Sequence, residues 1–264
     1  MISDKKIKAV FIGAGNLATN LAVALFNSNC HILQIYSRSE NSAKQLATRV
    51  KSAYTTQISE IINSADLYFI CVPDKIIPEI VSELHISNGI VAHTSGSTDI
   101  QILSNIKSTG YGIFYPFQSF SKNRIIAFNN IPICLNANND KTFTALNSVA
   151  SMISSKVIRM DSETLIWLHL TGIFVNNFTN HLLAISHQIS SEKKFNFELL
   201  RPLIDETVKK AFNGNPASSQ TGPAIRFDQN TINLHAEKLK EYKPELAEIY
   251  KALTLSIQSL AEKI

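Results

Sequence analysis

The residues that most suggest chemistry form the segment Phe11-Ile12-Gly13-Ala14-Gly15-Asn16-Leu17-Ala18. This segment has the pattern G-x-G-x-x-A, follows an apolar run and opens an amphipathic stretch. In such a strand–turn–helix unit Gly13 permits the tight turn, Gly15 lets a pyrophosphate approach the backbone, and the small Ala18 lets the helix pack closely on the strand. The free N–H groups at the positive end of the helix would bind the phosphates. The predicted dinucleotide contacts here are Gly13, Gly15, Asn16 and Leu17. A glycine-rich turn without a ligand is the alternative interpretation.

The choice of dinucleotide is predicted from the end of the next strand, Tyr36-Ser37-Arg38-Ser39. An Asp or Glu at this place would bind the ribose 2′-hydroxyl of NAD, and the segment contains neither. An arginine between two hydroxyl side chains can instead form charge-assisted hydrogen bonds to a 2′-phosphate. We therefore predict NADP(H), bound by Ser37, Arg38 and Ser39. The alternative is that Ser39 only caps the following helix while Arg38 is solvated.

Three later segments are expected in the same crevice, because ligands of such sheets bind beyond the carboxyl ends of the strands. They are Val72-Pro73-Asp74, His93-Thr94-Ser95-Gly96-Ser97 and Tyr115-Pro116-Phe117-Gln118. The second segment is rich in hydrogen-bonding groups and precedes a helix expected near Thr98, which suits an anionic or carbonyl group of a substrate. The predicted roles are cofactor binding for Val72, Pro73 and His93, catalysis for Ser95 and substrate binding for Ser97. Serine and threonine are also ordinary turn residues, and a structural role for His93 is equally compatible with the sequence.

A long apolar helix is predicted over Glu163–Ile189, and it is expected at the centre of a domain or a dimer because it is apolar nearly all round. Its polar residues lie on roughly one face, because their spacings from the first are seven, eight and eleven; they are His169, Asn176, Asn177 and Asn180. We predict His169 as a general acid, oriented by Asn177, with a structural hydrogen-bond network as the alternative.

A second unusual loop, Thr221-Gly222-Pro223-Ala224-Ile225-Arg226-Phe227-Asp228, follows in the helical part of the chain. Thr221 and Arg226 are predicted to bind the substrate, since a guanidinium group can grip a carboxylate or a phosphate. Asp228 is alternatively a simple helix N-cap.

The elements that must position these residues alternate between short β-rich runs and amphipathic stretches up to about residue 160. The predicted strands are Ile7–Ile12, Ile32–Ser37, Leu67–Val72, Ile90–His93, Gly112–Tyr115, Ile131–Leu135 and Lys156–Met160. Such alternation predicts an α/β fold with a doubly wound, mostly parallel Rossmann-type sheet. Beyond Asp161 the pattern is helical, with helices over Phe197–Phe212 and from Gln229 onward and a break at Pro244. We therefore predict a dinucleotide-binding domain over 1–161 and an all-α substrate and dimerisation domain over 162–264.

Composition limits the class of protein. The 264 residues are 45% apolar and 17% charged with three cysteines, which excludes disorder, collagen and a disulfide scaffold. The net charge of +4 comes without a segregated basic patch, so nucleic acid is not an expected partner. Cys30, Cys71 and Cys134 have no metal-ligand spacing and are expected to be buried in a reducing cytosol. Neither a signal peptide nor a membrane span is expected, and the predicted location is cytoplasmic.

Taken together, these residues resemble the Rossmann-like proteins with a helical C-terminal domain of unknown function, a group regarded as NADP oxidoreductases. The resemblance covers essentially the whole chain. Its marks are Gly13-x-Gly15, the segment His93–Ser97, His169 with Asn177, the Thr221-Gly222-Pro223 loop with Arg226 and Asp228, and finally His235 and Tyr250. Wider relatives are pyrroline-5-carboxylate reductase, deazaflavin-dependent NADP reductases and the 6-phosphogluconate and β-hydroxyacid dehydrogenases. The resemblance implies a dinucleotide cofactor and commonly a dimer formed by the helical domain.

The chain departs from the pattern of these relatives at three places. The family usually has His-Pro where this chain has Tyr115-Pro116, and Arg-Gly-Asp where it has Arg226-Phe227-Asp228. The dehydrogenases use a lysine with an asparagine one helical turn later, whereas the residue four after His169 is Ile173. The catalytic assignment depends on these departures more than the cofactor assignment does.

The leading expectation is an NADP-dependent oxidoreductase that transfers hydride to or from a carbonyl or imine of a small, anionic substrate, with His169 as the source of the proton. The first alternative is a non-catalytic NADP-binding or sensing protein whose helical domain binds a partner, which the missing lysine favours. A deazaflavin-dependent redox partner is a further alternative. A homodimer through the C-terminal helices is expected because the helix Glu163–Ile189 is too apolar for a single two-layer packing.

Overall fold

The computed structural model describes residues 6–262. The chain divides into two compact units, Met1–His181 and Leu182–Ile264. The first unit contains every strand, together with the helices between them and the start of the long helical stretch that follows. The second unit is helical.

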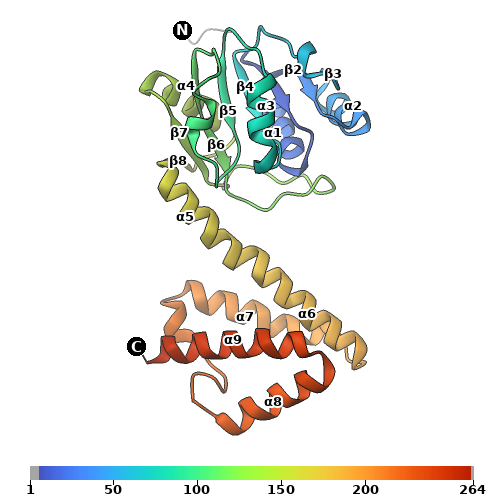
Figure 1. Cartoon of the computed structure of the whole chain (residues 1–264), viewed down its shortest axis with the longest axis vertical. Coiled ribbons are helices and arrows are strands. Elements are labelled where there is room, and N and C mark those ends of the chain that lie inside the picture. Colours follow the sequence, from blue (N-terminus) through green and yellow to red (C-terminus); the bar gives the residue numbers. More distant parts are fainter. Residues whose placement is uncertain (1–5, 263–264) are drawn as a thin grey trace. The chain divides into compact units, whose positions relative to one another are not determined.

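One eight-stranded sheet organises the first unit (Figure 1), with the strand order β3-β2-β1-β4-β5-β6-β7-β8. Its strands are β1 (Lys8–Ile12), β2 (His31–Tyr36), β3 (Ala53–Thr55), β4 (Leu67–Ile70), β5 (Ile90–His93), β6 (Gly110–Pro116), β7 (Ile133–Ala137) and β8 (Val157–Arg159). All neighbouring strands are parallel except β6 and β7, which are antiparallel. The predicted fold class, a mostly parallel Rossmann-type sheet followed by a helical region, is therefore confirmed.

Helices cover both faces of the sheet because successive strand residues point to opposite sides. Ala9 and Phe11 of β1 belong to a core with α1 (Asn16–Asn27), α2 (Glu40–Val50) and α4 (Asp140–Ser151). Val10 and Ile12 belong to the opposite core, with α3 (Ile77–Glu83) and the short 3-10 helix η3 (Ile100–Leu103). The turns η1 (Ile58–Glu60) and η2 (Asp74–Ile76) complete the connections.

The structure differs from the predicted elements at two places in this unit. Strand β3 was not predicted, because three residues, Ala-Tyr-Thr, carry too little pattern to show a period. The helix expected near Thr98 is the single 3-10 turn η3, which Asp99 caps by accepting a hydrogen bond from the Gln101 N–H.

The predicted helix Glu163–Ile189 is realised in three pieces. They are α5 (Ser162–Gly172), a π-helical turn η4 (Ile173–Phe178) and α6 (Thr179–Glu192). Leu165 packs in a small core with Ile113 and Cys134. In contrast, Trp167 is 61% and Val175 72% exposed, so the helix is not at the centre of a domain of its own chain, and the alternative, the centre of a dimer, stays a prediction. The helix carries apolar residues on every side, and the strands of the sheet pack against one side only.

The second unit contains the end of α6, then η5 (Phe197–Leu200), α7 (Arg201–Phe212), η6 (Pro216–Ser219), α8 (Gln229–Tyr242) and α9 (Pro244–Ala261). The break predicted at Pro244 is confirmed, since α8 and α9 meet at Lys243. Its buried residues, within the described part, are Ser190, Ala224, Ile232, Leu246 and Thr254. This unit therefore has a small core and leaves many apolar side chains in contact with solvent.

The change from strands to helices falls between Arg159 and Ser162, close to the boundary predicted at residue 161. The compact units divide later, inside α6. The domain limits 1–161 and 162–264 therefore stay a prediction. Across residues 6–262, no helix combines the length and the apolarity that a membrane crossing requires.

Candidate nucleotide and active site

A cavity of about 480 Å³ lies where β1, β2 and β4 end. Seven of the residues predicted to bind a cofactor line it, namely Gly13, Gly15, Ser37, Arg38, Ser39, Val72 and Pro73. It therefore occupies the crevice at the carboxyl ends of parallel strands, where this class of sheet binds ligands. The glycine motif and the segments that follow β2 and β4, which are far apart in the chain, meet at this cavity, whereas the predicted segments His93–Ser97 and Tyr115–Gln118 do not line it.

The two glycines of the turn have different surroundings. Gly13 has a φ of +120°, and a Cβ there would lie 2.2 Å from the Cys71 carbonyl oxygen, so the close approach of β1 to the end of β4 requires glycine. A Cβ on Gly15 would meet nothing within 4 Å among the described residues. The space above Gly15 is therefore open to a ligand that approaches the backbone.

The N-terminus of α1 faces this turn and is suited to an anion. Gly15 is the N-cap, and in the described chain neither a side-chain cap nor an acidic residue of the first turn neutralises the helix end. Helices carry partial positive charge and free N–H groups at this end. The predicted contacts Asn16 and Leu17 do not line the cavity with their side chains. The Asn16 carboxamide oxygen instead accepts a hydrogen bond from the Lys122 N–H at 3.1 Å.

Arg38 stands at the rim of the cavity with an exposed side chain. Its guanidinium group lies 3.9 Å from the Glu79 carboxylate, and both side chains are more than half exposed, so this ion pair is weak. The Ser39 hydroxyl accepts a hydrogen bond from the Ser42 N–H and caps α2. The capping role considered for Ser39 is thus present in the structure, alongside its position on the cavity wall.

Lys122 is a cavity residue that the sequence reasoning missed. It comes from the connection 117–132 between β6 and β7, and its ammonium group lies 3.4 Å from the Ser42 hydroxyl. Nothing in the local sequence marks this lysine. The available signal was the length of the connection itself, since long loops without secondary structure are uncommon and often functional.

A second cavity, of about 230 Å³, joins the end of β6 to α5 and η4. His169, Asn176 and Asn177 line it together with Tyr115, Phe117 and Gln118, whereas Asn180 does not. Three of the four polar residues predicted to share a helix face therefore reach one cavity. The Tyr115 hydroxyl and His169 Nδ1 are 3.0 Å apart.

Burial raises the pKa of Tyr115 to about 12. The phenol is therefore protonated near neutral pH. The tautomer of the His169 ring decides whether the phenol donates to Nδ1 or Nδ1–H donates to the phenol oxygen.

The predicted loop His93–Ser97 packs directly against this pair. A Cβ on Gly96 would lie 2.7 Å from Cζ of Tyr115 and 3.1 Å from Cβ of His169, so the loop, β6 and α5 meet at a glycine. The Ser95 hydroxyl oxygen accepts the N–H groups of Ser97 and Thr98, both at 3.1 Å, and so closes the turn.

The two other polar residues of this loop have different environments. The Ser97 hydroxyl donates to a carboxylate oxygen of Asp74. His93 is fully buried below the loop and does not line the nucleotide cavity. Its Nδ1 accepts the Ser95 N–H at 3.3 Å, and burial lowers its pKa to about 4. Its Nε2 is buried and has no hydrogen-bond partner among the described residues, so the choice between a structural role and a role in cofactor binding stays a prediction.

Thr221 and Arg226 belong to the second unit, where both are exposed. Asp228 caps α8 by accepting the Thr231 N–H at 3.2 Å. Phe227, at the place where relatives usually have glycine, has a φ of +53°. The roles of Thr221 and Arg226 in substrate binding stay predictions.

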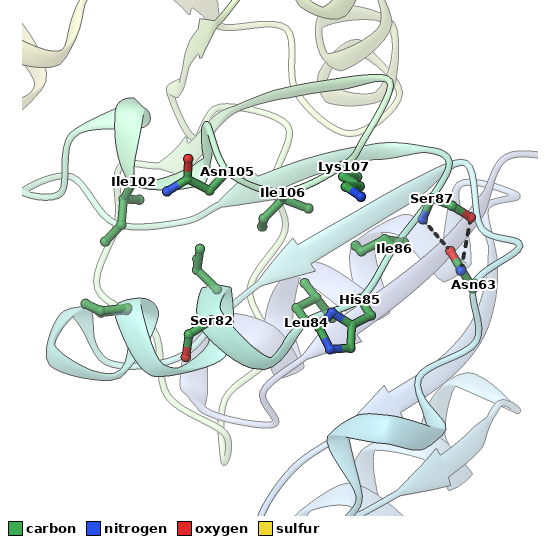
Figure 2. A pocket seen from close by; sticks show the side chains of 12 residues that line it. Asn63, Ser82, Leu84, His85, Ile86, Ser87, Ile102, Asn105, Ile106 and Lys107 are labelled. Atoms are coloured by element: carbon green, nitrogen blue, oxygen red, sulfur yellow. Dashed lines mark hydrogen bonds between the residues drawn. The ribbon is translucent and has the colours of Figure 1, made fainter.

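Another cavity, of about 720 Å³, lies elsewhere in the first unit. Figure 2 shows apolar side chains that line it, among them Leu84, Ile86 and Ile106, and the paired hydrogen bonds between Asn63 and Ser87. Its lining residues precede β4, β5 and β6, so it lies at the amino ends of the strands, opposite to the glycine turn. It contains none of the predicted site residues. Within residues 6–262, no group of three or more His, Cys, Asp or Glu side chains could hold a metal ion.

Comparison with known proteins agrees with this arrangement. Residues 1–113 match the Rossmann-like domain, and residues 131–257 match the domain of unknown function DUF2520. A crystal structure from Bacteroides fragilis, described as a proposed NADP oxidoreductase, is 38% identical, with a TM-score of 0.89 over 96% of this chain and 98% of that one. The chain belongs to the Rossmann-like/DUF2520 family. No curated protein matches it in sequence.

Two more distant structures share the fold of the Rossmann-like/DUF2520 family. A protein from Thermotoga maritima is 21% identical, with a TM-score of 0.79 over 96% of this chain and 99% of that one. A 1-pyrroline-5-carboxylate reductase from Streptococcus pyogenes is 12% identical, with a TM-score of 0.63 over 98% and 99%. The resemblance inferred from the sequence is therefore confirmed, and the structural neighbours of this family member include oxidoreductases.

Proposed function

We propose that this family member is an NADP-dependent oxidoreductase that acts on a carbonyl or imine of a small, anionic substrate. The observation that carries the proposal is the cavity over the Gly13–Gly15 turn, which combines an open approach to the backbone, an uncapped helix N-terminus and the cation Arg38. Each of these features suits one part of a phosphorylated dinucleotide. The description of the Bacteroides fragilis relative as a proposed NADP oxidoreductase supports the same activity.

The residues present fit this cofactor. The backbone at Gly15 would hold the pyrophosphate, and Arg38 and Ser37 would hold the 2′-phosphate, where an NAD-specific site would instead carry an acid. When bound, NADPH supplies a hydride from its nicotinamide ring. Orientation of the substrate and transfer of a proton are left to the protein.

Proton transfer is assigned to His169. In the imidazolium form, Nδ1–H donates to the Tyr115 oxygen 3.0 Å away, and Nε2 gives its proton to the oxygen or nitrogen that develops negative charge, which leaves a neutral ring. Tyr115 is therefore a positioning residue, which holds the ring of His169 in its orientation. Asn177 lines the same cavity and can hydrogen-bond the substrate.

The remaining predicted substrate contacts are proposed with narrower roles. The Ser95 oxygen already accepts two backbone N–H groups, so its contribution is to shape the loop beside Tyr115. Ser97 is exposed and keeps a hydroxyl at the loop surface. Thr221 and Arg226 are proposed to bind the acid group of the substrate from the helical region.

Replacement of His169 tests the assignment. His169→Gln should leave NADPH affinity unchanged, measured by calorimetry, and should lower turnover of small keto and imino acids by about 10²–10⁴-fold, the usual contribution of a positioned acid. His181→Gln, on the same helical stretch but outside the cavity, is the matched control and should retain full turnover. Unchanged turnover in folded His169→Gln would reject this proton donor. A wild-type protein that binds no nicotinamide nucleotide would reject the function itself.

A non-catalytic NADP-binding protein with a macromolecular partner is the second candidate. The observation that favours it is the exposed apolar surface of each unit's helices: Trp167 of the first unit is 61% exposed, and Leu199 and Phe212 of the second unit are 70% and 88% exposed. Surfaces of this kind usually mark an interface. Binding of NADPH without depletion of the nucleotide across a broad substrate screen would favour this candidate over the enzyme.

The same surface also leads us to propose a homodimer formed by the C-terminal helices. A second copy of the chain would cover apolar side chains that the small core of the second unit leaves exposed. Light scattering at micromolar concentration should give twice the mass of the chain, and a monomer would contradict the proposal. Cys30, Cys71 and Cys134 are free and buried, which agrees with the cytoplasmic location that we also propose.

A further inference from the structure

The connection 117–132 is attached to α1 by a set of hydrogen bonds centred on a buried asparagine. The Asn20 side chain is fully buried, donates to the Ser121 carbonyl at 2.9 Å and accepts the Ile126 N–H at 3.1 Å. Between these two bonds, the Lys122 N–H donates to the Asn16 side chain at 3.1 Å. Three bonds therefore hold the backbone on both sides of Lys122 in a defined position beside the nucleotide cavity.

This anchoring places the side chain of Lys122 in the cavity wall. The lysine is partly buried, and its ammonium group donates to the Ser42 hydroxyl at 3.4 Å. Among residues 6–262, no carboxylate lies within 4.0 Å of this ammonium group. An ammonium group has three donors, and a partly buried cation with one neutral partner is suited to an anionic ligand.

The position of Ser42 indicates which phosphate would be bound. Ser42 lies in the first turn of α2, directly after Arg38 and Ser39 at the end of β2. This end of the cavity is where a dinucleotide of this fold presents the 2′ position of its ribose. The ammonium group of Lys122 is therefore at the end of the cavity where the ribose 2′ position is expected, whereas the backbone N–H of Lys122 is hydrogen-bonded to Asn16 of α1.

We propose that Lys122 is a second cationic ligand of the 2′-phosphate, so that this phosphate is held from two segments, by Arg38 after β2 and by Lys122 from the connection 117–132. The inference rests on the proposed NADP site and adds a specificity-determining residue to it. A lysine contributes a compact charge and an arginine a planar fork, so the two side chains can share one phosphate group.

Affinity for two nucleotides that differ only in the 2′-phosphate tests the proposal. Calorimetry at fixed ionic strength should show that Lys122→Gln binds NADPH about 10- to 100-fold more weakly than wild type, the range expected for one charge-assisted hydrogen bond. Binding of NADH should change less than about threefold, because it lacks the group that Lys122 contacts. Lys122→Arg keeps the charge and should restore most of the preference for NADPH.

Lys44→Gln is the matched control. Lys44 lies on α2 two residues after Ser42, is exposed and does not line the cavity, so its loss changes the net charge equally. It should bind both nucleotides as wild type does. Circular dichroism and thermal denaturation establish that every variant is folded.

Several results would overturn the inference. If Lys122→Gln weakens NADPH and NADH equally, the lysine contacts the pyrophosphate or only supports the loop. If it binds both nucleotides like wild type, the side chain has no role in binding. Either result leaves the proposed NADP site intact, provided that wild type prefers NADPH. Failure of wild type to bind any nicotinamide nucleotide would instead reject the proposed function and the inference with it.

Discussion

Gly96 is the residue whose replacement most directly tests the packing of the candidate active site. It is buried, and a Cβ added there would lie 2.7 Å and 2.8 Å from Cζ and Cε1 of Tyr115. Carbon atoms pack at about 3.5 Å or more, so the Tyr115 ring would need to move by roughly 0.8 Å. A shift of this size along the line between the Tyr115 hydroxyl and His169 Nδ1, now 3.0 Å apart, would lengthen their hydrogen bond to about 3.8 Å, beyond a useful length.

The expected cost of Gly96→Ala is about 1–3 kcal/mol in the free energy of unfolding, the usual range for overpacking of a tightly packed site. Urea denaturation followed by circular dichroism measures it. Gly214→Ala is the control, because a Cβ there would meet nothing within 4 Å in the part of the chain that the structure describes. It should leave stability unchanged or raise it by about 0.4–1 kcal/mol, because alanine restricts the unfolded chain.

A double-mutant cycle identifies the clash. In a Tyr115→Ala background the ring is gone, so Gly96→Ala should cost hardly more than the Gly214→Ala control. A Gly96→Ala protein as stable as wild type would refute the predicted contact. A penalty that persists undiminished without the Tyr115 ring would place the cause elsewhere.

Three further predictions concern the nucleotide cavity and the buried histidine. Gly15→Val should keep a native circular dichroism spectrum, since the space above Gly15 is open, and should abolish NADPH binding by calorimetry, whereas retained binding would remove the cofactor proposal. Arg38→Ala should weaken NADPH by about 1.5–3 kcal/mol and hardly affect NADH, and an equal loss for both would contradict a contact with the 2′-phosphate. Burial lowers the pKa of His93 from 6.5 to about 4, so the unfolded chain binds the proton more tightly than the folded chain does. The contribution of the neutral His93 to the free energy of unfolding is therefore fully present above about pH 6.5, and about 3 kcal/mol of it is lost as the pH falls towards 4. Denaturation of wild type and His93→Asn between pH 7 and 4 should show a shallower pH dependence in the variant, and parallel curves would contradict the assignment.

The fold and the glycine turn could be predicted from sequence because their signals are local. The turn at Gly13 needs a positive φ, and strand periodicity extends over adjacent residues, so a short window contains the information. Lys122 could not be predicted in this way, because its position depends on bonds to Asn16 and Asn20, about a hundred residues earlier in the chain. The pairing of Tyr115 with His169 is likewise long-range.

The exposure of the long helix has a different cause. Its sequence shows that apolar side chains surround it, but sequence alone does not tell whether the same chain or another molecule covers them. The structure leaves Trp167 and Val175 exposed in this chain. A pattern of hydrophobicity thus predicts a buried face without identifying its partner.

The attachment of the connection 117–132 to Asn20 has a consequence for biosynthesis. The wall that contains Lys122 can form only after the ribosome has released the segment beyond β6, long after the glycine turn has emerged. A nascent chain that ends before this connection has the phosphate-binding motif but lacks part of the cavity. Because a ligand stabilises only the state that binds it, the proposed cofactor NADPH would favour chains whose synthesis has passed this connection over shorter ones.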